Sequence, residues 1–322
     1  MYFASVNIMK KAHLSTQGLI ILAFAAIYLI WGTTYVTILI GLEDFPPFLM
    51  ATIRFAIAGV LLVGWCLLKG ERLPSMRTIG QNFLLGVVML AGGQGLLFWS
   101  EQYIASGYAA ILVATIPIWF VIIDKSQWHT YFSNKYIIGG LFIGFLGILL
   151  LFKEQLSGSV YTDNMGLIAT VAVLFGCICW VGGSLYYRYH PTPGSIFSNL
   201  GWQIIGGGIF CAGISFMAGE GQGFSLSAVG WEAWLAVLYL AVVSSIIAFV
   251  TYYWLLHQMP AAIVGTYAYV NPVVAVLLGW LIADEIISVF QISGMAVIIC
   301  SALLINLPKY KALFTRKRAR VV

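Results

Sequence analysis

Charge is scarce in this chain of 322 residues. Asp, Glu, Lys and Arg together make up 8% of it, whereas hydrophobic residues make up 61% and aromatic residues 15%. The mean hydropathy is +0.96. This composition excludes a disordered chain, which needs many charges and few apolar residues, and it is typical of an integral membrane protein.

Several chemical signatures are also missing. No Gly-Lys-Ser/Thr phosphate loop occurs, which excludes transport driven by ATP within this chain. The four histidines have no metal-ligand spacing, and the five cysteines all fall inside apolar runs without a metal or disulfide pattern. No nucleophile–base–acid set falls within those runs. The sequence therefore predicts no catalytic residues, no metal and no cofactor.

The few charges occur in clusters that alternate in sign between long apolar runs. Lys and Arg are retained on the cytoplasmic side of a bilayer, so this alternation indicates a chain that crosses the membrane repeatedly. A helical span needs about 20 apolar residues. The runs give ten spans: 18–39, 47–68, 78–99, 105–123, 136–152, 165–187, 195–218, 232–256, 261–282 and 287–307.

An even number of spans places both termini on one side of the membrane. All Lys and Arg residues except Arg54 and Lys153 then share that side, and nine of the 11 acidic residues lie on the other. We therefore predict a multi-pass protein of the cytoplasmic (inner) membrane with both termini cytoplasmic. The segment 1–17 is interpreted as a cytoplasmic leader to an uncleaved first span, because no small-residue cleavage site follows the apolar run.

The tail 308–322 is basic. Such a tail is typical of a juxtamembrane cluster that faces anionic lipid, and we expect no nucleic-acid partner. The expected partners are the lipid bilayer and a small-molecule substrate. Whether the protein is a monomer or a homodimer is left open.

The chain divides at its most hydrophilic central loop, 153–164, into two units of five spans, 18–152 and 165–307. An odd number of spans per unit makes the second unit enter the membrane in the opposite sense, which is inverted-repeat topology. Pro117 and Gly139 recur at one constant offset as Pro272 and Gly294. The predicted fold is all-α, with ten transmembrane helices arranged as two inverted five-helix repeats.

Short motifs follow one another along about residues 18–307. They are 28–35 (YLIWGTTY), 45–48 (FPPF) with Arg54 and Ala58-Gly59, 101–117 (EQYIASGYAAILVATIP), Asn271-Pro272, Asp284-Glu285 and 291–294 (QISG). In this order the chain resembles EamA-type members of the drug/metabolite transporter superfamily, as two EamA repeats. One departure is visible, since Thr130 stands at the position matched to Glu285, where the family usually has an acidic residue after span 4.

Arg54 is the one charge well inside a span, and a charge at that depth costs at least about 2.5 kcal/mol unless it is paired or hydrated. Two interpretations are open. Arg54 lines a cavity and meets an anionic group of a substrate, or it ties helices together as the partner of Glu101 at the end of span 3. Glu101 itself is either such a charge partner or a proton-coupling carboxylate.

Aromatic and polar residues at helical spacing suggest the walls of a cavity for small, partly apolar solutes. The same residues also suit helix packing, so both interpretations stay open for each. Pro117 and Pro272 lie within spans, where each frees a backbone carbonyl and acts as a kink or gate. The candidate substrate-binding residues are Trp31, Tyr35, Arg54, Gln94, Trp180, Ser184, Tyr252, Tyr267 and Asn271.

The resemblance implies a secondary transporter that exports small organic metabolites such as amino acids by alternating access, and not an enzyme. Two rival classes are retained. A lipid-acting membrane enzyme needs a cluster of titratable residues at an interface, and none is visible in the sequence. A membrane sensor or scaffold would lack an internal cavity, so a solute-sized cavity between the two repeats would count against it.

Overall fold

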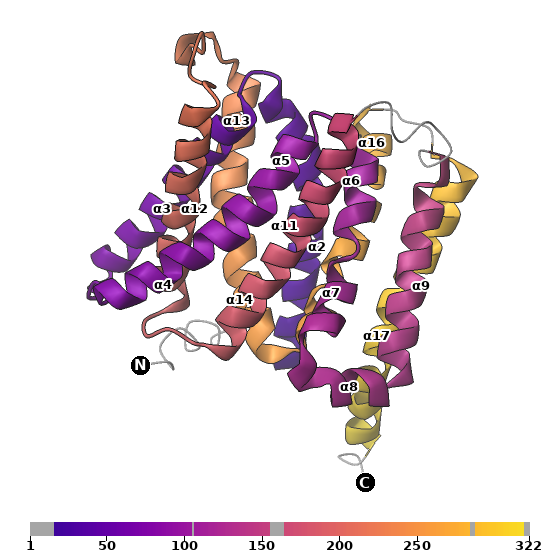
Figure 1. Ribbon diagram of the computed structural model, residues 1–322. Coiled ribbons are helices and arrows are strands. Elements are labelled where there is room, and N and C mark those ends of the chain that lie inside the picture. The colour runs from indigo at the N-terminus through magenta and orange to yellow at the C-terminus, as the bar shows by residue number, and fades with distance from the viewer. Residues whose placement is uncertain (1–15, 105, 155–163, 284–286, 319–322) are drawn as a thin grey trace.

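The structure is a computed structural model, and it describes residues 16–104, 106–154, 164–283 and 287–318. Within these ranges every regular element is a helix and no strand occurs. Helices suit an apolar environment because they satisfy their backbone hydrogen bonds internally. The described residues form a bundle of roughly parallel and antiparallel helices (Figure 1), which confirms an all-α architecture.

The described residues of the first half form ten helical elements. They are α2 (Thr16–Leu42), α3 (Pro47–Leu68), α4 (Met76–Gly86), the π-helix η1 (Val87–Gly95), α5 (Leu96–Ser100), α6 (Ser106–Val113), α7 (Ile116–Ile123), the short 3₁₀-helix η2 (Lys125–Gln127), α8 (Trp128–Ser133) and α9 (Lys135–Leu151).

The second half repeats much of this pattern. Its elements are α11 (Asn164–Tyr189), α12 (Ile196–Met217), the 3₁₀-helix η3 (Leu226–Ala228), α13 (Trp231–Tyr239), the π-helix η4 (Leu240–Ala248), α14 (Phe249–Gln258), α15 (Ala261–Val264), α16 (Tyr267–Ala283) and α17 (Val289–Arg318). α17 therefore continues past the expected limit of the last span at residue 307.

Among the described residues, seven helices are long and apolar enough to cross a membrane. A bent pair, Tyr108–Ile123 with Lys125–Ser133, is a candidate eighth, and its two parts meet at 71°. Lys135–Leu151 and Val289–Ile305 are apolar but shorter. The expected count of ten spans therefore stays a prediction. The seven are Thr16–Leu42, Pro47–Leu68, Met76–Ser100, Asn164–Tyr189, Ile196–Met217, Trp231–Gln258 and Ala261–Leu278.

The bundle has two chemically different ends. Loops 69–75 and 189–195 lie at one end of the bundle, together with residues 124–134, which include α8 (Figure 1). This end is called the basic end. The opposite end, where α2 gives way to α3 and where α13 begins, is called the acidic end. At the acidic end the two carboxylate oxygens of Glu220 accept hydrogen bonds from the Phe48 and Leu49 amides at 3.2 and 2.7 Å. A carboxylate there complements the positive pole of α3.

Irregular turns recur in the two halves at equivalent places. The π-helices η1 and η4 fall in the third expected span of the first half and the third of the second. A break at Ala114–Thr115 separates α6 from α7, and a break at Gly265–Thr266 separates α15 from α16. These are the fourth expected spans of each half. A π-turn inserts extra backbone into a helix and is frequent at functional sites.

The contacts between helices follow the same correspondence. α3 packs on α12 and α9 packs on α17, so each of these helices meets its counterpart from the other half. η1 packs on α11 just as η4 packs on α2, and α16 packs on α2 just as α7 packs on α11. In Figure 1 the α9–α17 pair stands at one edge of the bundle. Every one of these contacts joins the two halves, so the two halves share one core.

Small residues let the two halves approach closely. A Cβ added to Gly86 would meet the backbone oxygen of Gln203 at 1.8 Å, and one added to Gly294 would meet the Leu151 amide nitrogen at 2.5 Å. Such close backbone contacts are typical of helices that associate in lipid. Large apolar side chains such as Leu68, Phe216 and Trp280 are exposed on the outside of the bundle, which suits a lipid-facing surface.

Candidate functional site

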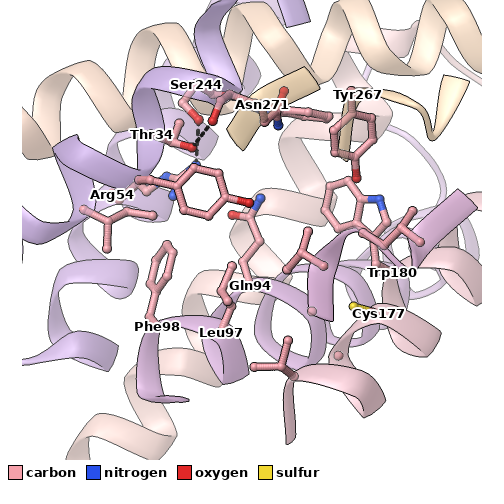
Figure 2. Close-up of a pocket in the computed structure, with 18 residues that line it drawn as sticks. Thr34, Arg54, Gln94, Leu97, Phe98, Cys177, Trp180, Ser244, Tyr267 and Asn271 are labelled. Carbon is pink, nitrogen blue, oxygen red and sulfur yellow. Dashed lines mark hydrogen bonds between the residues drawn. The ribbon is translucent and has the colours of Figure 1, made fainter. Parts of the chain in front are cut away.

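A cavity of roughly 690 Å³, part of it open to solvent, lies in the middle of the bundle between the two halves. Its lining of aromatic and apolar side chains with a few polar groups is typical of sites for small organic molecules. In Figure 2, Arg54 and Phe98 lie on one side, Trp180 and Tyr267 on the other, and Gln94 points between them. The lining residues are Trp31, Thr34, Tyr35, Ile38, Arg54, Gly93, Gln94, Leu97, Phe98, Val113, Ile116, Val173, Gly176, Cys177, Trp180, Ser244, Tyr267 and Asn271.

Arg54 is held in the cavity wall by the π-helix η4. Its Nε donates to Ser245 Oγ at 2.8 Å and its Nη2 donates to Ser244 Oγ at 3.1 Å. The guanidinium also lies 5.7 Å from the ring centroid of Phe98, a distance suited to a cation–π contact. Within the described part of the chain, no protein acceptor reaches Nη1. Arg54 is therefore fixed in position with one nitrogen left for another molecule.

The expected ion pair between Arg54 and Glu101 does not form, which corrects that interpretation of both residues. Both carboxylate oxygens of Glu101 are buried and have no hydrogen-bond partner. The physical reason is that the guanidinium of Arg54 donates its hydrogen bonds to two serines on η4 instead. Glu101 lies beyond Phe98, directly after α5. Glu101 instead lies close enough to Tyr35 to interact with its phenol electrostatically.

Three further polar atoms in the cavity wall are buried and unpartnered. They are Oε1 of Gln94, Nε1 of Trp180 and Oδ1 of Asn271. A buried polar atom without a partner costs about 1–3 kcal/mol of stability, so three around one cavity are a substantial cost. Two acceptors, one donor and the free Nη1 of Arg54 form a set that a solute with its own donors and an anionic group would satisfy.

An aromatic cluster closes the cavity on the side of the basic end. The Trp31 ring lies 4.6 Å from Tyr267, 5.2 Å from Tyr252 and 5.5 Å from Phe249, measured between ring centroids. Trp180 packs against Trp31 at 5.8 Å. Behind these rings the Ser184 and Tyr252 hydroxyls share a hydrogen bond of 2.8 Å.

A second closure lies at the basic end itself, where Asp124 joins the two halves. Its Oδ1 accepts from Ser126 and from Tyr189 of α11 at 2.7 and 2.8 Å, and its Oδ2 accepts from Tyr131 at 2.9 Å. The Tyr131 hydroxyl in turn accepts from the amide of Ala262 in α15 at 3.3 Å. Asp124 is only 2% exposed. These five residues are called the Asp124 network below.

Seven of the nine candidate substrate-binding residues line the cavity, and two do not. Ser184 and Tyr252 share a hydrogen bond with each other, and Tyr252 belongs to the aromatic cluster. The seven come from five different spans, which the fold brings together, and their contact with a substrate stays a prediction. They are Trp31, Tyr35, Arg54, Gln94, Trp180, Tyr267 and Asn271.

The two candidate prolines relate differently to the helix breaks. Pro117 lies in the first turn of α7, directly after the break at Ala114–Thr115. Pro272 lies inside α16, whereas the break in that span comes before it at Gly265–Thr266. At this break Gly265 lets α7 approach closely, because a Cβ there would meet the Phe120 ring at 2.7 Å. A gating role for either proline stays a prediction.

Sequence reasoning missed two residues of this architecture. Ser244 looks like an ordinary small residue in a span, and nothing in the sequence marks it as the partner of Arg54. Asp124 does have a signal, because it is an acidic residue among the basic clusters and follows directly on a span. In the residues that the structure describes, no group of three or more His, Cys, Asp or Glu could hold a metal ion.

The model of the EamA-like transporter family matches residues 18–153 and again residues 167–307. This chain belongs to the EamA-like transporter family. The two matches cover the two halves described above, so the family model occurs twice in this chain. Membership of this family identifies the protein as a membrane transporter, and it implies a small-molecule substrate and a lipid bilayer as partners.

Similar proteins carry the same general description. The chain is 36% identical over 291 residues to the uncharacterized inner membrane transporter YedA of Escherichia coli K12, covering 89% of this chain and 90% of YedA. It is 26% identical to the uncharacterized transporter YoaV of Bacillus subtilis, covering 89% and 96%. A solved crystal structure with 20% identity matches with a TM-score of 0.71 over 90% of this chain and 98% of the other, which supports the fold alone.

Proposed function

We propose that this protein is a secondary transporter that exports small organic metabolites, amino acids first among them, across the cytoplasmic membrane by alternating access. The observation that carries the proposal is the cavity between the two halves, with its unpartnered polar atoms. Arg54 Nη1 suits a carboxylate, and the Gln94 and Asn271 oxygens suit an ammonium or amide group. The aromatic walls suit an apolar side chain.

Alternating access needs a cavity that is closed on one side at a time. In this state the aromatic cluster and the Asp124 network fill the path toward the basic end. The recurrence of π-helices and breaks in equivalent spans supports ten spans in two inverted repeats that rock against each other. The placement of Lys and Arg supports cytoplasmic termini, so the basic end is cytoplasmic and the basic tail faces anionic lipid.

Reconstitution in proteoliposomes tests the proposal. Uptake and counterflow of a panel of metabolites would be measured with and without a proton gradient, with empty vesicles as the blank. We expect flux above the blank for at least one carboxylate-bearing solute. A folded protein that moves none of the panel above the blank would contradict the proposal and favour a sensor or scaffold.

Arg54 is the residue to vary in that assay. Arg54→Ala removes the nitrogen that meets the anionic group, so we expect folded protein with lost flux of carboxylate-bearing solutes. Arg54→Lys keeps a charge but loses the fork that reaches two serines, so we expect altered selectivity. Arg72→Ala, which removes an exposed cation from a loop, is the matched control and should transport normally. Normal flux in Arg54→Ala would contradict the assigned contact.

A further inference from the structure

Glu101 is the acidic residue whose surroundings are least explained by the fold. It follows directly on α5, at the acidic end of the span Met76–Ser100. Both carboxylate oxygens are buried, and among the residues that the structure describes neither has a hydrogen-bond partner. An ionised carboxylate is an acceptor only, so it needs donors or water to stay charged. Because both oxygens are buried and no donor among the described residues reaches them, the surroundings of Glu101 favour the protonated, uncharged form.

The groups that face Glu101 do not supply a compensating positive charge. η1 carries no titratable side chain, and neither do residues 164–176 of α11, the two elements that lie against α5 most closely. α3 carries Arg54, which is bound to two serines instead. α2 supplies the phenol of Tyr35, and α6 carries that of Tyr108. A phenol brings no cation, so a bound proton is what neutralises this carboxylate.

Burial raises the pKa of Glu101 to about 8. A carboxyl with such a pKa is mostly protonated at neutral pH while it is buried, and it releases its proton once water reaches it. The position of Glu101 links this change to the cavity, because its neighbour Tyr35 is part of the cavity wall. A solute that displaces Tyr35, or a rearrangement of the acidic end, changes the surroundings of the carboxyl.

We infer that Glu101 is the residue that binds and releases the proton coupled to transport, an inference that rests on the proposed function. The carboxylate takes up one proton and forms one O–H bond when it becomes buried as in this state. That bond breaks and the proton passes to water when the acidic end rearranges. No other bond changes, and no co-reactant besides water is needed. The cavity binds the solute, and Glu101 couples its movement to the proton gradient.

A spectroscopic titration tests proton binding without any knowledge of the substrate. Infrared absorption of protonated carboxyl groups would be followed against pH in the purified full-length protein. We expect a band that disappears with a midpoint near pH 8, and that is absent in Glu101→Gln. Glu43→Gln, which alters an exposed acid at the same end, should keep the band. A band unchanged in Glu101→Gln would overturn the inference, and so would a midpoint in the ordinary glutamate range.

A transport measurement tests the coupling. In proteoliposomes, wild-type protein should accumulate a transported solute in response to a proton gradient and should also exchange it in counterflow. Glu101→Gln should lose gradient-driven accumulation and keep counterflow, whereas Glu43→Gln should keep both. Loss of both activities in folded Glu101→Gln would overturn coupling in favour of a structural role, and proton-driven accumulation in that variant would overturn it outright.

The two measurements separate the two proposals. A wild-type protein that transports no solute would overturn the proposed function, and the coupling with it, while the infrared titration still decides whether Glu101 binds a proton. A transporting wild-type protein whose Glu101→Gln variant behaves identically would leave the proposed function standing and remove only this inference.

Discussion

Buried polar groups have hydrogen-bond partners at the basic end of this protein, whereas several around the cavity lack one. At the basic end, both oxygens of Asp124 are engaged by three hydroxyl groups, and the neighbouring Asn82, Asn199 and Gln203 also satisfy one another. Around the cavity, Gln94 and Asn271 each leave an oxygen unpartnered, and Arg54 leaves a nitrogen unused. The two regions are built from the same residue types.

This difference separates polar groups that hold the halves together from those that we propose bind a solute. A satisfied network lowers the free energy of one arrangement of the halves, so it specifies the closed basic end. An unsatisfied set costs stability unless something binds to it, which is the reason for our proposal that a solute binds here. Burial alone does not distinguish them, because Arg54 and Asp124 are 1% and 2% exposed.

Removing the centre of the satisfied network should have the largest effect on stability. Asp124→Ala leaves the hydroxyls of Ser126, Tyr131 and Tyr189 without their acceptor, and we expect a loss of about 3 kcal/mol in the free energy of unfolding. Denaturation of the purified protein in detergent measures this loss. Glu43→Ala, an exposed acid, is the control and should change little. Equal stability of the two variants would remove the distinction drawn between the two regions.

Close packing of the halves offers a second test. Gly86→Ala places a Cβ at 1.8 Å from the Gln203 backbone oxygen in the basic half of the bundle, so the helices must shift, and we expect a loss of about 2 kcal/mol. The Cβ of Gly93→Ala in the cavity wall meets the Trp180 side chain at 3.5 Å and the Gly176 backbone oxygen at 3.6 Å, which are ordinary contact distances. We expect that variant to unfold like the wild type. A similar loss of unfolding free energy in both variants would show that the helices pack as tightly around Gly93 as around Gly86.

The smallest effect on stability is expected where a polar atom has no partner to lose. Gln94→Met keeps a similar length and removes the unpartnered oxygen, so the free energy of unfolding should change by less than about 1 kcal/mol or increase. Flux through proteoliposomes should nevertheless fall or change its selectivity. A large loss of stability would mean that Gln94 belongs with the structural network.

Much of the fold follows from the sequence, because the apolar runs between the charge clusters are the helices. The expected segment 47–68 coincides with α3, and 195–218 differs from α12 by one residue at each end. The π-helices could not be predicted, since they depend on how η1 and η4 pack between other helices. α8 was also missed, because 124–134 is polar enough to look like a loop.

The sequence predicted many of the residues that form the candidate site, but it did not predict how they are arranged or which partners they have. Trp31 and Trp180 belong to corresponding motifs of the two halves, and both line the cavity. Arg54 was conspicuous as a charge within a span, but its partners lie 190 and 191 residues away in sequence and have no charge to reveal them. Ser184 and Tyr252 share the helical faces of cavity residues, but neither one lines the cavity.

The π-helix η1 has a consequence for how the third expected span is built. A π-turn contains about one residue more than an α-turn, so every side chain after it is rotated by about 100° relative to an uninterrupted helix. Gln94 lies within this segment and Glu101 follows it by six positions. Deleting one residue of η1 would restore a regular helix and turn Glu101 to a different face. The direction of the side chains that follow η1, Glu101 among them, therefore depends on one additional residue in the π-helix.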